Sequence, residues 1–172
     1  EKNWLDDWYD SAEQMNEYKK KGKLALKIFY ENLQKGPIPN IKALERGFNI
    51  KIGDNTITGK MDRVDAVGDG EIEIVDYKTG NPPKNDKLTV PDKRQLLIYQ
   101  IGAEEVFREK VKNLTYYYVD SAAPIEFLGT DEEKQEVKLW ITETIDEIHK
   151  SDFMLNPKQH FCDYCDYFLD LG

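Results

Sequence analysis

The sequence predicts an α/β domain with a mixed central sheet flanked by helices. Apolar residues recur at helical spacing over residues 9–35, and three successive segments between residues 43 and 78 alternate as strands do. After residue 90 the patterns indicate a helix, two strands and a further helix. This order is typical of helices packed on a sheet, and 172 residues suffice for one domain with a sizeable core.

The first half of the chain is expected to form one helix and an antiparallel meander. The helical pattern of residues 9–35 stops at Gly36-Pro37. Residues 43–53 alternate as a strand, Asp54-Asn55 is a turn signal, and 56–67 and 71–78 are the next two strands. Short connections between these segments favour antiparallel neighbours.

The second half is expected to alternate between helices and strands. Residues 80–90 have the composition of a loop, and Pro91 suits the first turn of a helix with Asp92 near its positive end. That helix is predicted to run to about Lys110. Strands are predicted at 113–119 and around 124–128, before an acidic amphipathic helix over 131–150.

Two short motifs hold most of the functional information, Gly59-Lys-Met-Asp62-Arg-Val-Asp65 and Glu73-Ile-Val-Asp76-Tyr-Lys78-Thr-Gly80. The glycine-rich segment Gly68-Asp69-Gly70 between them is predicted to be a hairpin turn. If Asp69 is its centre, the numbers of cross-strand partners sum to 138, so Asp62 lies opposite Asp76. Lys78 follows Asp76 by two residues and shares its face of the strand.

Two carboxylates and an ammonium group in one place are suited to phosphodiester hydrolysis. Mg²⁺ prefers oxygen ligands and usually takes one or two carboxylates, which Asp62 and Asp76 would supply together with the backbone carbonyl of Tyr77. Lys78 would orient the attacking water or contact the phosphate. The alternative is a structural salt-bridge cluster, because an isolated Asp-x-Lys on a strand is common.

Gln95 and Tyr99 are candidates for an accessory role because they lie four residues apart, on one face of the predicted helix. Gln95 could hydrogen-bond a water or a phosphate, and Tyr99 could position backbone or base. The alternative is that both are ordinary residues of a helix surface.

The charge distribution modifies what the net charge of −9 suggests about nucleic acids. Thirteen acidic residues against four lysines lie between Asp120 and Asp170, whereas residues 78–94 are locally basic. We expect Lys84, Lys87 and Arg94 in this basic stretch to contact the DNA backbone. The alternative is a solvated acidic helix with a flexible basic loop.

The order of four motifs resembles the RecB-like branch of the PD-(D/E)xK nucleases, from about Tyr18 to the C-terminus. They are Gly-x-x-Asp-Arg-x-Asp, Ile-Val-Asp-Tyr-Lys-Thr-Gly, Gln-Leu-x-x-Tyr and Cys-x-x-Cys. The resemblance implies a restriction-endonuclease-like core and cleavage of DNA with Mg²⁺ or Mn²⁺, usually from ends. It also implies a fused or partner helicase. Asp62 and Asp76 would be the metal ligands, Lys78 the catalytic lysine, and Gln95 with Tyr99 the accessory helix motif.

The cysteines depart from this pattern. Many relatives hold an iron–sulfur cluster with one upstream and three C-terminal cysteines, but here Cys162 and Cys165 are the only two and Leu171 occupies the place of the next. Two thiolates do not complete a four-thiolate cluster. We therefore expect no iron–sulfur cluster; a truncated chain, a degenerate site and a weak zinc half-site with His160 are the alternatives. Glu45 is a candidate for the missing upstream metal ligand, or else a solvent-facing strand residue.

The sequence thus predicts a metal-dependent DNA nuclease domain, most simply an exonuclease in repair, recombination or end processing. We expect residues 1–172 to be one domain of a longer protein, because the chain lacks an initiator methionine. A cytoplasmic location is expected, since no signal peptide or membrane-spanning run is present. Two alternatives are a non-catalytic DNA-end-binding or scaffolding module and an acidic protein-interaction domain.

Overall fold

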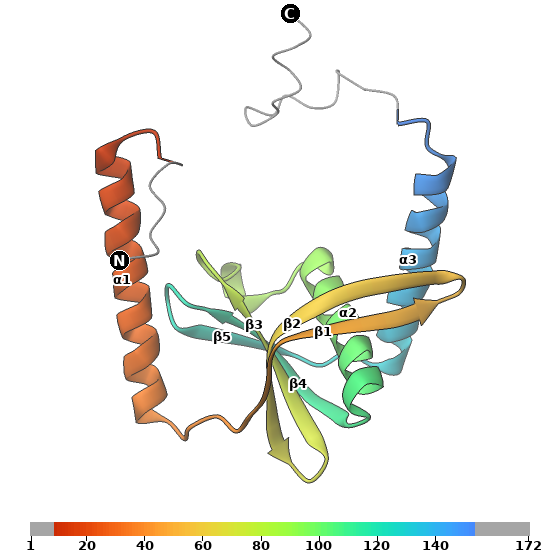
Figure 1. Ribbon diagram of the computed structural model, residues 1–172, viewed down its shortest axis with the longest axis horizontal. Helices are drawn as coiled ribbons and strands as arrows, with labels where there is room; N and C mark the ends of the chain where they lie inside the picture. Colours follow the sequence, from red (N-terminus) through yellow and green to blue (C-terminus); the bar gives the residue numbers. More distant parts are fainter. Residues whose placement is uncertain (1–8, 154–172) are drawn as a thin grey trace, which may run out of the picture.

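A computed structural model describes residues 9–153, and the predicted α/β class is confirmed (Figure 1). Three helices and five strands follow one another in the predicted order, and the predicted loop between β3 and α2 contains one short 3₁₀ turn. Their bounds are α1 Ala12–Lys35, β1 Ile41–Ile52, β2 Asn55–Gly68, β3 Glu71–Lys78, η1 Lys84–Asp86, α2 Val90–Phe107, β4 Lys110–Tyr118, β5 Ala123–Phe127 and α3 Asp131–Lys150.

The sheet is mixed and has the strand order β1-β2-β3-β4-β5. The first three strands form the predicted antiparallel meander, β4 runs parallel to β3, and β5 is antiparallel to β4. The parallel pair is possible because α2 forms the crossover between β3 and β4. The pairs Arg63↔Val75 and Val64↔Ile74 sum to 138, so the predicted hairpin register is confirmed.

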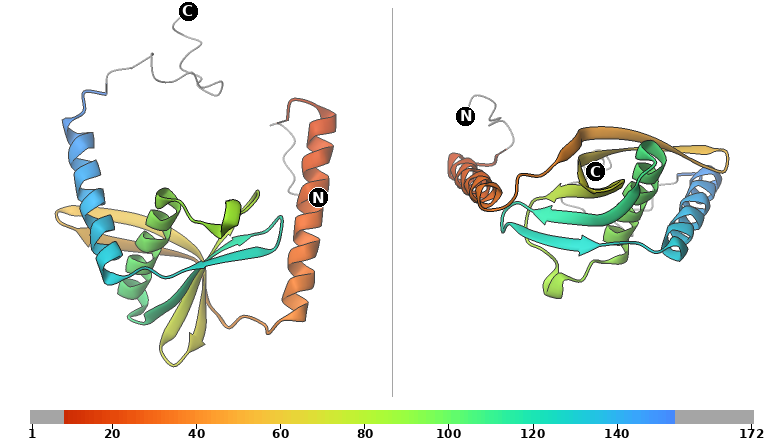
Figure 2. Two further views of the ribbon diagram at one scale, coloured as in Figure 1. Left: turned by 180° about the vertical axis from the view of Figure 1, so that it is seen from behind. Right: turned by 90° about the horizontal axis from the view of Figure 1, so that it is seen from below.

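The three helices flank the sheet unequally. α2 packs on one face and contacts β1, β2 and β4, while α3 contacts α2 and β1. α1 lies on the other side of the molecule from α3, beside the sheet (Figures 1 and 2). Its Phe29 contacts the rings of Tyr77 and Tyr117, which alternate in sequence with the residues that face α2.

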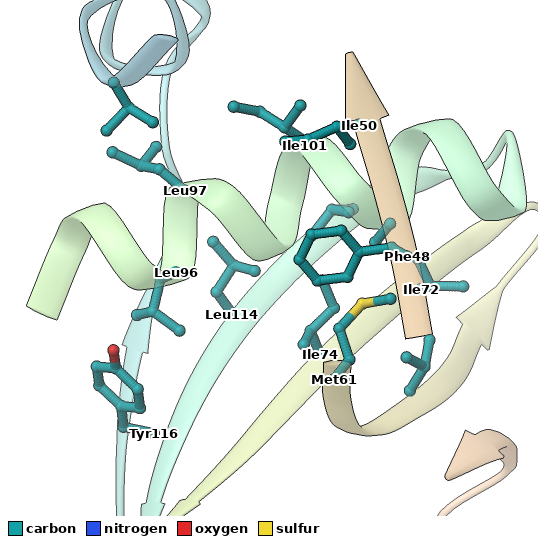
Figure 3. Packing of buried hydrophobic residues seen from close by; sticks show 14 of the residues in the cluster. Phe48, Ile50, Met61, Ile72, Ile74, Leu96, Leu97, Ile101, Leu114 and Tyr116 are labelled. Atoms are coloured by element: carbon teal, nitrogen blue, oxygen red, sulfur yellow. The ribbon is translucent and has the colours of Figure 1, made fainter. Parts of the chain in front are cut away.

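The hydrophobic core lies between α2 and the sheet. Leu96 of α2, Leu114 of β4, Ile74 of β3 and Met61 of β2 are fully buried there (Figure 3). Along β2 the side that faces the core changes between Met61 and Val64: both residues are fully buried and lie three apart, although strict alternation would place them on opposite faces. There the β1–β2 ladder lacks the pair Glu45↔Asp62, and Glu45 has a positive φ of 50°. Asp62 lies at the change.

Several element boundaries differ from those predicted, most clearly around the end of α2. α2 ends at Phe107 rather than near Lys110, because Arg108 adopts a left-handed conformation with φ 54° and its backbone N–H bonds the carbonyl of Glu104. β4 therefore begins at Lys110 rather than at residue 113. β3 spans Glu71–Lys78 as predicted, and the β2–β3 link is shorter than predicted because β2 extends to Gly68. Among residues 9–153, no helix has the length and apolar character needed to span a bilayer.

Candidate active site

The candidate site lies where two neighbouring strands of the sheet separate. The β2–β3 pairing ends at Arg63↔Val75, one residue before Asp62 and Asp76 would meet. Beyond this point β2 continues alongside β1, and β3 alongside β4. Figure 1 shows the β1–β2 hairpin turning away from the other three strands, with α2 behind it. Backbone groups that would otherwise pair are therefore free to take side-chain partners.

The side chain of Asp62 bonds one of these unpaired backbone groups. Its Oδ2 accepts a hydrogen bond of 3.0 Å from the backbone N–H of Tyr77, which follows Asp76 on the opposite strand. The predicted register thus places the carboxylate of Asp62 beside the end of β3. Its charge is also one of the influences that raise the pKa of Asp76, as expected of neighbouring carboxylates.

Asp76 is buried, with 4% of its surface exposed. Its Oδ2 lies 2.8 Å from Nζ of Lys78, yet this oxygen receives no well-aligned hydrogen bond from residues 9–153. Burial raises the pKa of the Asp76 carboxyl above its ordinary value; Lys78 opposes the rise, Asp62 adds to it, and a hydrogen bond from Tyr99 opposes it. Asp76 is therefore a carboxylate that another cation would stabilise.

Lys78 is connected to α2 through Gln95. Nζ of Lys78 donates to Oε1 of Gln95 at 3.0 Å, and Nε2 of Gln95 donates to the hydroxyl of Tyr99 at 2.9 Å. The four-residue spacing of Gln95 and Tyr99 places both on one helix face, as predicted. The structure thus brings Asp76, Lys78, Gln95 and Tyr99 into one connected cluster, which Asp62 joins through the backbone N–H of Tyr77.

Tyr116 completes this cluster, although the sequence did not indicate it. Its hydroxyl lies 2.9 Å from Oε1 of Gln95, and the ammonium of Lys78 lies 4.6 Å from the centre of its ring. Burial raises the pKa of Tyr116, so its hydroxyl stays protonated and able to donate. The signal that could have found Tyr116 is the β3–β4 register, which pairs it with Asp76. That register is not visible in a sequence where the two strands are joined by a helix.

The helix face that carries Tyr99 is supported by Phe48 of β1. The two rings meet edge to face with centroids 6.0 Å apart. Gly59 and Gly102 leave the space for Phe48: a Cβ at either position would come within 2.3 Å and 2.6 Å of its ring, respectively. Gly59, the first residue of the first motif, is therefore required by packing around the site.

The remaining predicted residues lie apart from the cluster. Lys84 and Lys87 are exposed in the β3–α2 connection, while Arg94 stacks over the ring of Trp140, 4.1 Å from its centroid. Glu45 forms an exposed ion pair with Lys60, which matches the solvent-facing alternative. Cys162, Cys165 and His160 lie outside the described residues.

A second polar network occupies the opposite face of β2 and β3. Arg63 pairs with the buried Asp65 at 3.0 Å and donates to the hydroxyl of Tyr77 at 2.6 Å. Oδ1 of Asp65 has no hydrogen-bond partner among the described residues, and burial raises its pKa. Because Tyr77 lies between Asp76 and Lys78, this network holds the end of β3 from the face opposite the candidate site.

The residues present fit a divalent metal. The cluster offers two carboxylates, one of them buried with an oxygen that lacks a hydrogen bond. This matches Mg²⁺, which takes one or two carboxylates and keeps several waters. No group of three or more His, Cys, Asp or Glu side chains suited to a metal occurs within residues 9–153. Asp62 and Asp76 would therefore hold the ion with waters completing its shell.

Comparison with solved structures supports the same fold. A putative exonuclease from Eubacterium rectale is 16% identical with a TM-score of 0.55, over 84% of this chain and 59% of that protein. The chain thus spans less than two thirds of that relative. A second structure, SSO0001, is 22% identical over 90% of this chain and 76% of that protein, but its TM-score of 0.47 is too low to establish a shared fold.

Comparison with protein families gives a more specific result. No curated protein matches the chain significantly. The profile of the PD-(D/E)XK nuclease superfamily, however, matches residues 3–168, which is nearly the whole chain. The matched residues include β2 and β3, which separate at the candidate site, and the helix α2. The chain therefore belongs to the PD-(D/E)XK nuclease superfamily.

Proposed function

We propose that this chain is a metal-dependent deoxyribonuclease domain that hydrolyses phosphodiester bonds at DNA ends. The observation that supports this most strongly is that Asp62, Asp76 and Lys78 lie together where β2 and β3 separate. A bound Mg²⁺ or Mn²⁺ would polarise the phosphate and lower the pKa of a water. The name of the Eubacterium rectale protein favours an exonuclease.

Each residue has a distinct role in this proposal. Asp62 and Asp76 hold the metal, with the backbone carbonyl of Tyr77 as a further oxygen ligand. Lys78 directs its ammonium at the attacking water or at the charge that develops on the phosphate. Gln95 positions Lys78 through their 3.0 Å hydrogen bond. Tyr99 donates a hydrogen bond to the carboxylate of Asp76.

The basic residues outside the cluster are proposed to guide the DNA backbone. Lys84 and Lys87 are exposed on the connection that leaves the site after β3. Their contacts with phosphates would weaken as salt rises. Repair or recombination is the setting that fits end-directed cleavage, with a helicase domain or subunit as the partner that supplies the ends.

A non-catalytic DNA-end-binding module is the second candidate, favoured by the net charge of −9. The carboxylate of Asp76, whose pKa is raised by burial and further by the neighbouring Asp62, argues against it. Such an arrangement is costly in a module that needs neither a metal nor catalysis.

The test separates metal binding, DNA binding and cleavage. Wild-type protein, Asp76→Asn and the control Asp69→Asn are incubated with end-labelled linear DNA and Mg²⁺ or Mn²⁺. Asp69 is the matched control because it is exposed in the turn of the same hairpin. We expect cleavage by the wild type and the control, none with EDTA, and none by Asp76→Asn. DNA binding without any metal-dependent product would favour the non-catalytic module instead.

A further inference from the structure

A groove lies beside the candidate active site and is not used by the proposed chemistry. It has a volume of about 570 Å³ and runs between the β1–β2 hairpin, α2 and α3. This size falls within the range of small-molecule sites. The lining residues that matter here are Phe48, Tyr99, Trp140, Gln95, Arg94 and Lys60.

The groove and the catalytic cluster share a wall. Gln95 and Tyr99 line the groove, while the same two side chains bond each other and Lys78. A ligand in the groove would therefore lie one side chain away from the phosphate that Lys78 would contact. This continuity points to part of the same substrate rather than to an unrelated molecule.

The chemistry of the groove combines flat apolar surfaces with cations. Phe48 and Tyr99 pack edge to face on the inner side. On the α3 side, Arg94 stacks over Trp140 at 4.1 Å. Lys60, ion-paired with Glu45, lies at the hairpin. Aromatic and guanidinium planes stack on nucleobases, and neighbouring cations suit the attached phosphates.

We propose that this groove binds one unpaired nucleobase of a DNA end, with Trp140 and its stacked Arg94 as the platform. The inference rests on the proposed function and adds a preference for single-stranded ends. In a duplex each base is covered by its neighbours and its partner strand, so occupying the groove would cost the unstacking of a base pair. A single strand pays little of this cost. An apolar peptide suits the groove less well, because Arg94 would gain no anionic partner.

The first test uses the wild-type protein alone, with binding measured by fluorescence anisotropy in EDTA so that no cleavage occurs. The probes are a labelled 12-nucleotide oligothymidylate, the same strand with a single abasic site moved along it, and a blunt 12-base-pair duplex. We expect tighter binding of the single strand than of the duplex. One abasic position near the end should weaken binding about 10-fold, in line with the loss of one stacked base. Insensitivity to every abasic position, or tighter binding of the duplex, would overturn the proposal.

The second test changes the platform. Trp140→Ala should lose about 10-fold in affinity for the intact strand and should no longer respond to the critical abasic position. Trp140→Phe should keep most of both properties. Leu139→Ala is the matched control, because Leu139 is the preceding residue of α3 and is 64% exposed. A Trp140→Ala protein that responds to the abasic site as the wild type does would contradict the assignment.

These binding results are independent of catalysis. If the base dependence is present but no metal supports cleavage, the groove stands and the proposed nuclease function fails. If cleavage occurs with no dependence on any base, the nuclease function stands and the nucleobase site is wrong.

Discussion

The ring of Phe48 lies within the space that a side chain at Gly59 would fill, since a Cβ there would be 2.3 Å from its Cζ. Phe48 in turn supports Tyr99 of the candidate active site. The glycine that opens the first motif thus positions a residue on a different element, and its role is steric rather than chemical.

Gly59→Ala should therefore displace Phe48 and disturb Tyr99. Overpacking of this kind costs about 1–3 kcal/mol, and each kcal/mol corresponds to a fall in Tm of about 2–4 °C at this size. Thermal melting measures it, with Gly47→Ala as control because a Cβ at Gly47 meets only an ordinary contact at 3.8 Å. Equal melting temperatures for the two variants would show that Phe48 moves without cost.

Asp76→Asn should stabilise the metal-free protein at neutral pH by about 1 kcal/mol, because burial of the Asp76 charge is only partly offset by its ion pair with Lys78. The folded-state pKa of Asp76 is raised, so its contribution to stability is full below the unfolded-state pKa of about 3.9 and is lost as pH rises through the folded-state pKa.

Thermal melts from pH 4 to 8 in EDTA should therefore diverge, with the variant losing less stability as the pH rises. Mg²⁺ should raise the Tm of the wild type but not that of Asp76→Asn. If Asp76→Asn is less stable than the wild type at pH 7 without metal, burial of the Asp76 charge does not destabilise the fold. Asp65, whose pKa is also raised, remains in both proteins and so cancels in the comparison.

Arg63→Met should destabilise the fold by about 3–5 kcal/mol, because it leaves the buried Asp65 carboxylate without its cation. Chemical denaturation gives the free energy of unfolding. Lys110→Met is the control, since Lys110 is 76% exposed and 4.0 Å from Glu71, a geometry worth little. The double variant Arg63→Met/Asp65→Leu should recover much of the loss. A small effect of Arg63→Met alone would mean that the network behind β3 is not structural.

Much of the fold could be predicted because its signals are local. The hairpin register follows from the position of Asp69 in the turn, so the approach of Asp62 to Asp76 was visible in the sequence. The start of α2 was also visible through Pro91 and Asp92. Asp92 forms a capping box with Thr89, a residue predicted to lie in the preceding loop. By contrast, the end of α2 depends on a left-handed residue, Arg108, of a type that gives no such signal.

The parts of the site that were missed depend on long-range packing. Tyr116 reaches the cluster only because β4 lies parallel to β3, a pairing set by the crossover through α2. Trp140 reaches the groove only because α3 packs against α2. Neither distance along the chain nor residue type indicates these contacts.

The most direct test of the central claim is the rate at which the protein shortens end-labelled single-stranded DNA with Mg²⁺ or Mn²⁺ when Lys78 is replaced. Lys78→Met keeps most of the side chain but removes the ammonium that lies 2.8 Å from Asp76. Lys112→Met, at an exposed lysine 3.2 Å from Glu71, is the control, and circular dichroism checks that all three proteins are folded. We predict cleavage by the wild type and Lys112→Met, and a rate about 100-fold or more lower for Lys78→Met, as for loss of a group that stabilises developing charge. Equal cleavage by the wild type and Lys78→Met would contradict a catalytic role of Lys78. No cleavage by the wild type with either metal would contradict the proposed nuclease function.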